Sequence, residues 1–335
     1  MKVLFFMHTF GEKNGIAMHA GQLISHFPPE VRVQAIHGGG ISFPLFSSLR
    51  LPVGGFFKAL SADFDVMHIH GYGNFHSFFG AWAAILRNKP LVWTIHGYPQ
   101  IHGARRLFYY VYRHFMAPFI FFKAKRIITV STNVITLLQK ETRKEITFIP
   151  NGIDLEAFRP KSDYKGAKYA CYVGRLDPDK GVFRMLECSS MPVKFIGPNE
   201  DGTKSALAEE AKRRGREITF EEVPFERMPA AYESCRYVAL PSKYEGFPMS
   251  MLESVAMGRP FICTDVGEVR ATLANLFDSP SEFIIEGNLE AKISALEKKD
   301  LSGGLAAARG KLDKYSWQSI AQKTAEIYSQ AMGGQ

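Results

Sequence analysis

The chain has 335 residues, of which 46% are hydrophobic and 22% charged, and its formal net charge is +8 at pH 7. This length is enough for about two domains with substantial cores, and the ordinary composition excludes a disordered chain, a solenoid and a small disulfide-stabilised protein. Residues 1–150 hold 16 Lys and Arg against 6 Asp and Glu, whereas residues 151–335 hold 25 against 27, which favours two domains with different partners.

The first half of the chain contains short apolar runs bounded by polar residues or glycine. Such runs are typical of parallel strands that helices cover on both faces, because these strands lose the alternation of polar and apolar side chains. The predicted strands are Val3–Met7, Val31–Ile36, Val66–Ile69, Leu91–Ile95 and Ile127–Val130.

A second series of strands and helices follows in the other half. The predicted strands are Tyr169–Val173, Val193–Ile196, Tyr237–Leu240 and Phe261–Cys263, and the predicted helices include Lys204–Arg214, Met249–Met257 and Leu289–Leu296. Alternating strands and helices predict the α/β class, with two doubly wound domains and a boundary near Pro160–Lys165.

The four cysteines are widely spaced and lack the spacing of metal ligands; they are Cys171, Cys188, Cys235 and Cys263. No signal peptide is recognisable before them. We therefore expect a reducing, cytoplasmic compartment.

The loop after the first strand, "HTFGEKNGIAMHA", is a weak candidate for binding phosphate. Ligands of open parallel sheets bind beyond the carboxyl ends of the strands, where Gly11 and Gly15 would let the backbone approach and a helix from about Ile16 would offer its positive end. The G-x-G-x-x-G spacing of a dinucleotide site is absent, and a plain glycine turn explains the loop about as well.

The loop "VGRLDPDKG" follows the first strand of the second half. Arg175 and Lys180 flank an Asp-Pro turn at a predicted junction of strand and helix, so two cations converge where a helix N-terminus already favours anions. Either residue alone would be read as a solvated charge, but together they predict an anion site.

The stretch "YEGFPMSMLE" places two carboxylates on different elements. Glu245 falls in a predicted loop, Pro248 suits the first turn of the next helix, and Glu253 lies inside that helix. Such a pair fits the acid and nucleophile of a glycosidase, or carboxylates that accept hydrogen bonds from sugar hydroxyls, or two surface charges.

Four motifs together resemble a known family. The stretch "YEGFPMSMLESVAMGRP" is similar to the E-x7-E signature of retaining glycosyltransferases with the GT-B fold, most of all family 4, and "GRLDPDKG" resembles their diphosphate loop. The segment "IPNGIDLEAFRP" (Ile149–Pro160) resembles their interdomain connector, and "YSWQSIAQKTAEIY" (Tyr315–Tyr328) resembles their terminal helix.

The resemblance implies a domain layout. Residues 1–160 would form an acceptor-binding Rossmann-like domain that the C-terminal helix 316–333 completes by crossing back, and residues 161–315 would bind the donor, a nucleoside-diphosphate sugar. The two domains would face each other across a cleft.

It also implies roles for residues. Arg175 and Lys180 would hold the donor diphosphate, Glu253 the ribose hydroxyls and Glu245 the donor sugar, with His96 of "TIHGYPQ" at the reacting sugar. His96, Glu245, Arg175 and Lys180 are thus the catalytic candidates. Further donor-binding residues would be Gly15, Gly174, Gly197, Gly246, Phe247 and Pro248.

The implied reaction is hexosyl transfer with retention, in the synthesis of a glycolipid, polysaccharide or cell-surface glycan. Protein cations would stabilise the leaving diphosphate, so no metal and no cofactor is expected. The sequence departs from the family pattern at Asn14, Glu222, Glu268 and Arg270. Alternatives are a GT-B epimerase or hydrolase of sugar nucleotides, a phosphorylase with a pyridoxal cofactor and a sugar-nucleotide sensor without activity, whereas no nucleic-acid module accompanies the basic half.

Two segments of the basic half mix aromatic and basic residues, Phe43–Leu60 and Arg105–Arg126. Neither has an uncharged run long enough to span a bilayer, but both have the composition of interfacial segments on an anionic membrane. For Arg105–Arg126 we favour core packing of the aromatic residues, with Pro118 breaking or kinking the helix. For Phe43–Leu60 the two interpretations are balanced, and the acceptor is expected to be a sugar or a lipid-linked sugar at the inner face of the membrane.

Overall fold

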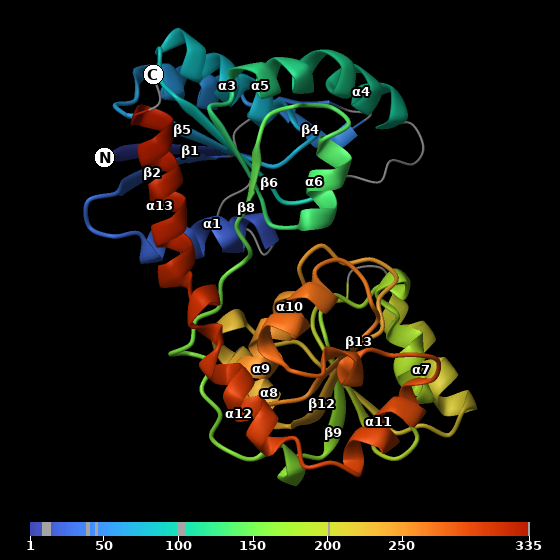
Figure 1. Cartoon of the computed structure of the whole chain (residues 1–335). Helices are drawn as coiled ribbons and strands as arrows, with labels where there is room; N and C mark the ends of the chain where they lie inside the picture. Colours follow the sequence, from blue (N-terminus) through green and yellow to red (C-terminus); the bar gives the residue numbers. More distant parts are fainter. Residues whose placement is uncertain (9–14, 38–40, 44–45, 99–104, 200–201, 334–335) are drawn as a thin grey trace. The chain divides into compact units, whose positions relative to one another are not determined.

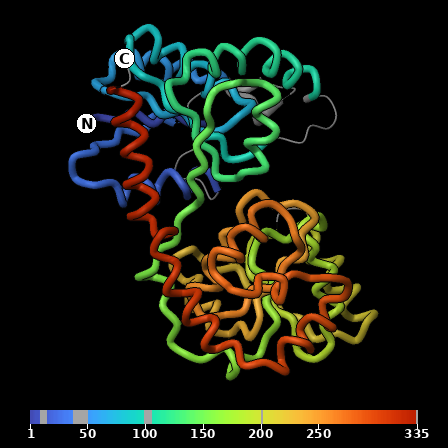
Figure 2. The backbone as a smooth tube through the Cα atoms, viewed as in Figure 1, coloured from blue at the N-terminus to red at the C-terminus, as the bar shows by residue number. Residues whose placement is uncertain are grey.

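The computed structural model describes residues 1–8, 15–37, 41–43, 46–98, 105–199 and 202–333, with the backbone alone at 41–43, 46–50 and 105. The chain forms two compact units, Met1–Gly152 with Trp317–Gln335 and Ile153–Ser316. Both ends of the chain belong to the first unit (Figure 2). Each unit is an α/β unit built on a parallel sheet, as predicted.

The first unit contains a six-stranded sheet in the order β2-β1-β5-β6-β7-β8, with every neighbouring pair parallel. Its strands are β1 (Lys2–Met7), β2 (Arg32–His37), β5 (Val66–His70), β6 (Leu91–Ile95), β7 (Arg126–Thr129) and β8 (Ile146–Phe148). Every residue of β5 and β6 is buried, which explains why these strands read as continuous apolar runs. The hairpin of β3 (Ile41–Phe43) and β4 (Phe46–Leu51) is separate from this sheet.

Helices cover both faces of the first sheet. Figure 1 shows α3 and α5 on one face and α1 and α13 on the other, and α13 packs against α1, β5 and β6. The helices are α1 (Gly15–His26), α2 (Val53–Ser61), α3 (Phe75–Leu86), α4 (Arg105–Val111), α5 (Ala117–Lys123), α6 (Thr132–Leu138) and α13 (Trp317–Gly333). Among the described residues, no helix combines the length and the apolarity that crossing a membrane requires.

Helices α4 and α5 continue into each other through a π-helical turn, Tyr112–Met116. The N–H of Ala117 donates to the carbonyl of Tyr112, five residues back. Pro118 then falls in the first turn of α5, where a missing N–H is tolerated. The helical run therefore continues past Pro118 without a break, because the extra residue of the π turn accommodates the proline, and a kink there stays a prediction.

The second unit contains a five-stranded parallel sheet in the order β11-β10-β9-β12-β13. Its strands are β9 (Tyr169–Val173), β10 (Val193–Ile196), β11 (Ile218–Glu221), β12 (Cys235–Leu240) and β13 (Phe261–Cys263). Its helices are α7 (Thr203–Arg213), α8 (Met228–Glu233), α9 (Met249–Ala256), α10 (Val269–Leu276), α11 (Leu289–Glu297) and α12 (Ser302–Gly310). The strand order 3-2-1-4-5 reverses direction between β9 and β12, and sheets of this kind bind their ligands in a crevice at the carboxyl ends of the strands at such a point.

The boundary between the units lies eight residues before the predicted one. Residues 153–160 belong to the second unit, where the Ile153 N–H donates to the Tyr315 carbonyl and Phe158 is buried in the core. Arg309 also donates to the carbonyls of Leu155 and Phe158. These contacts join the predicted connector to the second unit.

Two of the cysteines are paired despite their separation of 64 residues in the sequence. Cys171 on β9 and Cys235 on β12 lie on adjacent strands with their Cα atoms 5.5 Å apart, and a disulfide joins them. Cys188 and Cys263 are buried thiols. The expectation of a reducing compartment did not anticipate this pair, because strand pairing brings together residues that the sequence keeps apart.

Candidate functional site

The loop after β9 carries the first half of the candidate site. Gly174 adopts φ +150, and Asp177 caps a short 3-10 helix, Pro178–Lys180, by accepting a hydrogen bond from the Asp179 N–H. Gly181 then adopts φ +74, and a Cβ there would lie 2.0 Å from the Pro241 carbonyl oxygen. The expected α-helix is thus replaced by 3-10 turns (Pro178–Lys180 and Val182–Glu187), held tightly against the loop after β12.

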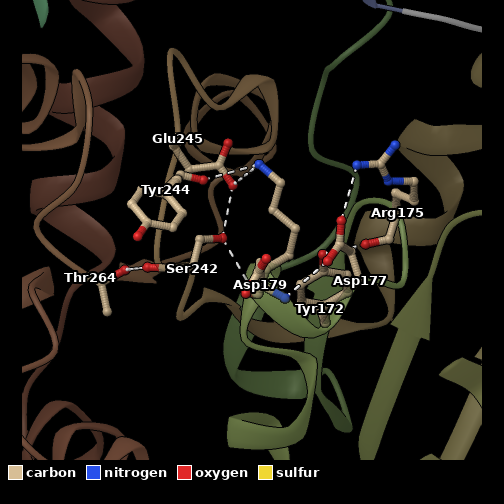
Figure 3. A network of polar contacts seen from close by, with 9 residues as sticks. Tyr172, Arg175, Asp177, Asp179, Ser242, Tyr244, Glu245 and Thr264 are labelled. Atoms are coloured by element: carbon tan, nitrogen blue, oxygen red, sulfur yellow. Dashed lines mark hydrogen bonds and ion pairs between the residues drawn. The ribbon is translucent and has the colours of Figure 1, made fainter. Parts of the chain in front are cut away.

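Lys180 and Glu245 meet across the crevice between β9 and β12. The Lys180 Nζ lies 2.9 Å from Glu245 Oε1 and donates to the Tyr244 carbonyl at 3.1 Å. Glu245 Oε1 also accepts a hydrogen bond from the Ser242 hydroxyl at 2.8 Å (Figure 3). A cation from one loop and a carboxylate from the other therefore lie side by side, both largely shielded from solvent.

Arg175 lies at the other side of this network, where its guanidinium contacts Asp177 at 3.0 Å and remains half exposed (Figure 3). The Tyr172 hydroxyl donates to the Arg175 carbonyl at 2.6 Å and so fixes the backbone of the loop. Burial, together with the charges of Glu245 and Asp177, raises the pKa of Tyr172 above its usual range and keeps this hydroxyl a donor.

Glu253 lies apart from this network. Its side chain on α9 is 6% exposed, and Oε2 accepts a hydrogen bond from the buried Tyr232 hydroxyl at 2.7 Å. Burial raises the pKa of Glu253 to about 7, against the opposing effect of the Tyr232 hydrogen bond. Among the described contacts Glu253 shares no hydrogen bond with Lys180 or Glu245, so the structure does not join the two glutamates.

Close backbone packing holds the loops of the crevice, and sequence reasoning missed most of it. A Cβ at Gly197, at the end of β10, would lie 2.1 Å from the Gly174 carbonyl oxygen, and one at Gly267 would lie 2.2 Å from the Glu245 carbonyl oxygen. The Glu268 N–H also donates to the Gly246 carbonyl at 3.0 Å. Glu268, which looked like a departure from the family, therefore supports the Glu245 loop together with Gly267.

The residues after Gly246 anchor the start of α9. Phe247 is buried, with its ring centroid 6.4 Å from that of Tyr315. Pro248 occupies the N-cap rather than the first turn, and its carbonyl accepts from the Met251 N–H. Because Phe247 and Pro248 are held in this way, the loop that carries Glu245 can adopt few conformations.

His96 belongs to the first unit and lies in a cluster of histidines near the carboxyl ends of β5 and β6. His70 Nδ1 is 3.2 Å from His96 Nε2, and the rings of His19 and His96 are 4.8 Å apart. His19 is bonded to Asn151 at 2.9 Å, while His68 is bonded to Tyr328 and Thr94 at 2.7 Å each. Burial and the neighbouring histidines lower the pKa of His68, His70 and His96, and burial lowers that of His19 to about 4.

Gly15 is the first residue of α1, with open space where a Cβ would stand. Gly11 and Asn14 of the same predicted loop lie outside the described residues. No group of three or more His, Cys, Asp or Glu in the described part of the chain is arranged to hold a metal ion.

Two family models match the chain over most of its length. The model described as Glycosyltransferase Family 4 matches residues 16–157, and that described as Glycosyl transferases group 1 matches residues 154–302. The second match contains the loops after β9 and β12, with Arg175, Lys180, Glu245 and Glu253.

The individual relatives share less than 30% of their residues with this chain over the matched regions. The chain is 27% identical over 175 residues to the O-antigen chain mannosyltransferase B of Escherichia coli, covering 48% of this chain and 45% of that protein. It is 28% identical to the putative teichuronic acid biosynthesis glycosyltransferase TuaC of Bacillus subtilis, covering 66% and 57%. The chain thus spans about half the length of these relatives.

Solved structures show the fold. Anabaena Alr3699/HepE in complex with UDP superimposes with a TM-score of 0.75 at 16% identity, covering 98% of this chain and 100% of that one. The apo form of the lipopolysaccharide outer core galactosyltransferase WaaB gives a TM-score of 0.60 at 14% identity, covering 98% and 100%.

Proposed function

Because this chain belongs to the GT-B glycosyltransferases of the family 4, group 1 type, we propose that it transfers a hexose from a nucleoside-diphosphate sugar to an acceptor hydroxyl with retention at the anomeric carbon. The observation that carries the proposal is the contact between Lys180 and Glu245 at the reversal point of the second sheet. A cation and a carboxylate at one crevice suit a donor that joins an anionic diphosphate to a sugar rich in hydroxyl groups.

The pairing of Lys180 with Glu245 suggests how the donor is received. A diphosphate that enters the crevice offers Lys180 a stronger partner than the Tyr244 carbonyl, and the half-exposed guanidinium of Arg175 can join it there. When Lys180 turns to the phosphate, the Glu245 carboxylate becomes available to accept hydrogen bonds from the donor sugar. In the free site the two groups therefore position each other.

In the transfer, the bond between the anomeric carbon and the terminal phosphate oxygen breaks, and the acceptor oxygen forms a bond to the same face of that carbon. The acceptor proton passes to the departing phosphate oxygen. Negative charge grows on the diphosphate, where Arg175 and Lys180 stabilise it, so that the reaction needs no added metal. Glu253 would accept the ribose hydroxyls, and His96 would contact the reacting sugar.

The names of two relatives suggest an acceptor for this chain. One is an O-antigen chain mannosyltransferase and another is named for teichuronic acid biosynthesis. We propose that this chain also acts in the synthesis of a polysaccharide or glycolipid of the cell surface.

A transfer assay tests the proposal. Purified protein is incubated with UDP-, GDP- and ADP-hexoses and a panel of saccharide acceptors, and the product anomer is identified by NMR. We expect one donor to give a product of the same anomeric configuration, and Lys180→Gln to lower its turnover. An inverted product contradicts the mechanism, and isomerised or intact donor identifies an epimerase or a sensor.

The first unit also carries a surface that suits an anionic membrane. Along α4 and α5, every third or fourth residue is apolar or proline and exposed, with exposed fractions of 73% for Leu107, 69% for Phe115 and 72% for Phe122. Val111 and Pro118 complete this stripe, which we call the α4–α5 stripe. Tyr112, Ile120 and Phe121 of the same segment are buried in the core, as expected, so core packing and the exposed stripe lie on different faces of the segment.

Positive charges flank the α4–α5 stripe. Arg106, Lys123 and Lys125 are exposed, and the Lys123 ammonium lies 4.9 Å from the centre of the Phe122 ring. Apolar side chains can enter the lipid interface while cations meet the headgroups, each adding about 1 kcal/mol near an anionic surface. We therefore propose that the chain attaches peripherally to anionic lipid through this stripe.

Co-sedimentation with vesicles tests the attachment. We expect binding to vesicles of phosphatidylglycerol and phosphatidylcholine that falls with salt and is lost when Phe115 and Phe122 are changed to Ser. Phe148→Ser, at another exposed phenylalanine of the same unit, is the matched control. Absence of binding at low salt, or equal binding by the stripe variant, contradicts the proposal. In the segment Phe43–Leu60, Phe56 packs against Phe79 and Phe57 is exposed, while residues 44–45 and the side chains of residues 43 and 46–50 lie outside the described part of the chain.

A further inference from the structure

A pocket of ≈ 340 Å³ lies in the first unit between α4 and the residues that follow β5 and β6. Tyr72 follows β5, Tyr98 follows β6, and Arg106, Tyr109 and Arg113 come from α4 and the π turn. We propose that this pocket binds an anionic sugar of the acceptor, one that carries a phosphate or a carboxylate. The identification of this ligand as the acceptor rests on the proposed glycosyl transfer.

A buried carboxylate organises the pocket. The side chain of Glu141 is 6% exposed and accepts hydrogen bonds from the Tyr72 hydroxyl at 2.5 Å and the Tyr98 hydroxyl at 2.6 Å. The Arg113 Nε lies 2.7 Å from the same carboxylate. One acid thus fixes two tyrosines and an arginine from three separate segments, which gives a preorganised site rather than a loose surface.

The hydrogen-bonding groups that remain are complementary to an anionic sugar. Both tyrosine hydroxyls donate to Glu141, so their oxygens are left to accept from sugar hydroxyls. Burial and Glu141 raise the pKa of Tyr98 to about 12, which keeps that hydroxyl protonated. Arg113 uses only its Nε in the ion pair, so its two terminal nitrogens are left to bind an anion.

The charge in the pocket also favours an anion. Arg106 is exposed and forms no ion pair within the described part of the chain. Two guanidinium groups against the single carboxylate of Glu141 leave a net positive charge. A neutral sugar would use the tyrosines alone, whereas a phosphorylated or acidic sugar would use both kinds of group.

Aromatic rings form the walls. The rings of Tyr72 and Tyr98 are 5.3 Å apart, and Tyr72 stacks on the buried Trp93 at 5.7 Å. Tyr109 lies over Gly73, where φ is +79 and a Cβ would come within 2.2 Å of its ring. The Tyr109 ring can occupy this position because residue 73 is a glycine without a side chain. Flat apolar rings beside hydroxyl groups are complementary to the apolar faces and the hydroxyl groups of a sugar.

Direct binding tests the pocket independently of transfer. Glucose 1-phosphate, glucuronate, methyl glucoside and inorganic phosphate are titrated into the full chain by calorimetry and by saturation-transfer NMR. We expect the two anionic sugars to bind more tightly than methyl glucoside and than phosphate alone. Arg113→Gln and Arg106→Gln should each weaken the anionic sugars about tenfold or more, as expected for the loss of a charged hydrogen bond.

Two further variants separate the pocket from general effects. Tyr98→Phe keeps the ring and removes one hydroxyl, so it should weaken the neutral and anionic sugars alike. Arg32→Gln changes an exposed arginine at the start of the edge strand β2, whereas the pocket lies beyond the ends of the central strands β5 and β6, and it should leave binding unchanged. Equal weakening by Arg32→Gln would assign the effect to overall charge and overturn the proposal.

Release of nucleoside diphosphate without acceptor, measured on the same preparations, distinguishes this proposal from the proposed function. If the donor is turned over but neither anionic sugar binds at millimolar concentration, or phosphate alone binds as well as its sugar, the pocket proposal is overturned and the transferase stands. If the anionic sugars bind through Arg113 but no donor is bound or turned over, the pocket stands and the transferase fails.

Discussion

Replacement of Glu253 by Gln should make the second unit more stable and a poorer binder of nucleotide. Glu253 is enclosed on α9 with one hydrogen bond, from Tyr232, and burial raises the pKa of its carboxyl from 4.5 to about 7. Because the pKa of Glu253 is raised in the folded state, the contribution of this carboxyl group to stability is fully present below pH 4.5, and it is lost as the pH rises through 7 and the buried group ionises. Gln keeps the acceptor for Tyr232 and carries no charge at any pH.

The change in the free energy of unfolding follows from the shift in the pKa of Glu253. Ionising Glu253 in the folded state costs about 3 kcal/mol relative to the unfolded chain, so the free energy of unfolding should rise by up to that amount at pH 8 in Glu253→Gln and stay almost unchanged near pH 4.5. For a unit of this size, this corresponds to roughly 6 to 12 °C in Tm. Loss of a charged acceptor for the ribose hydroxyls should weaken nucleoside diphosphate by about 1.5 to 3 kcal/mol.

Differential scanning calorimetry from pH 5 to 8 and titration calorimetry at pH 8 measure the two effects. Glu245→Gln is the matched control, because this carboxylate is paired with Lys180 and should affect turnover while sparing nucleotide affinity. If Glu253→Gln shows the wild-type dependence of Tm on pH, the buried ionisable state of Glu253 is refuted. If its nucleotide affinity is also unchanged, its role at the ribose is refuted.

Three further predictions follow from the described contacts. The pKa values of the buried histidines His68, His70 and His96 are lowered from 6.5, so the stability that they contribute should be present above pH 6.5 and lost as the pH falls, by up to about 1.4 kcal/mol per histidine and pH unit. Tryptophan fluorescence should report the melting of the first unit, because Trp82, Trp93 and Trp317 all lie there. A Tm of the first unit that stays constant from pH 7 to 5 contradicts this prediction. Gly267→Ala should lower turnover and Tm together, since its Cβ would meet the Glu245 backbone at 2.2 Å where φ is +58, whereas Gly303→Ala, with open space at its Cβ, should change neither. Transfer should survive EDTA, and Arg175→Ala should cost on the order of a hundredfold in turnover; loss of transfer in EDTA that magnesium or manganese restores contradicts this.

Most of the strands that the sequence predicted are buried on both faces, and the partly exposed edge strand β2 is the exception. β5, β6 and β9 consist almost wholly of buried residues, and their apolar runs therefore predict them directly. The short edge strands β8 and β11 were missed, because edge positions leave their side chains partly exposed and remove the apolar run. The glycines of the donor loops were recognised through a family pattern, but only packing shows that Gly197 and Gly267 press on neighbouring carbonyls.

The polar partners were less predictable, because they depend on which strand ends lie together. The ion pair of Lys180 and Glu245 joins residues from the loops after β9 and β12, and strand order brings those loops into contact. The partner of Glu253, Tyr232, comes from the preceding helix α8, and no pattern in the sequence indicated that this carboxylate is enclosed. Glu141 contacts tyrosines that follow β5 and β6, and no pattern around it in the sequence indicates that cluster.

Binding of nucleoside diphosphates at the crevice between β9 and β12 is the central claim, and titration calorimetry tests it most directly. UDP, GDP and ADP are titrated into the wild type, Lys180→Gln and a control, Lys168→Gln, which changes an exposed lysine paired with Glu217 elsewhere in the second unit. We expect at least one nucleotide to bind the wild type and the control equally and Lys180→Gln about tenfold or more weakly, as for a lost charged contact. No binding of any nucleotide to the wild type, or equal affinity in all three proteins, would contradict the account.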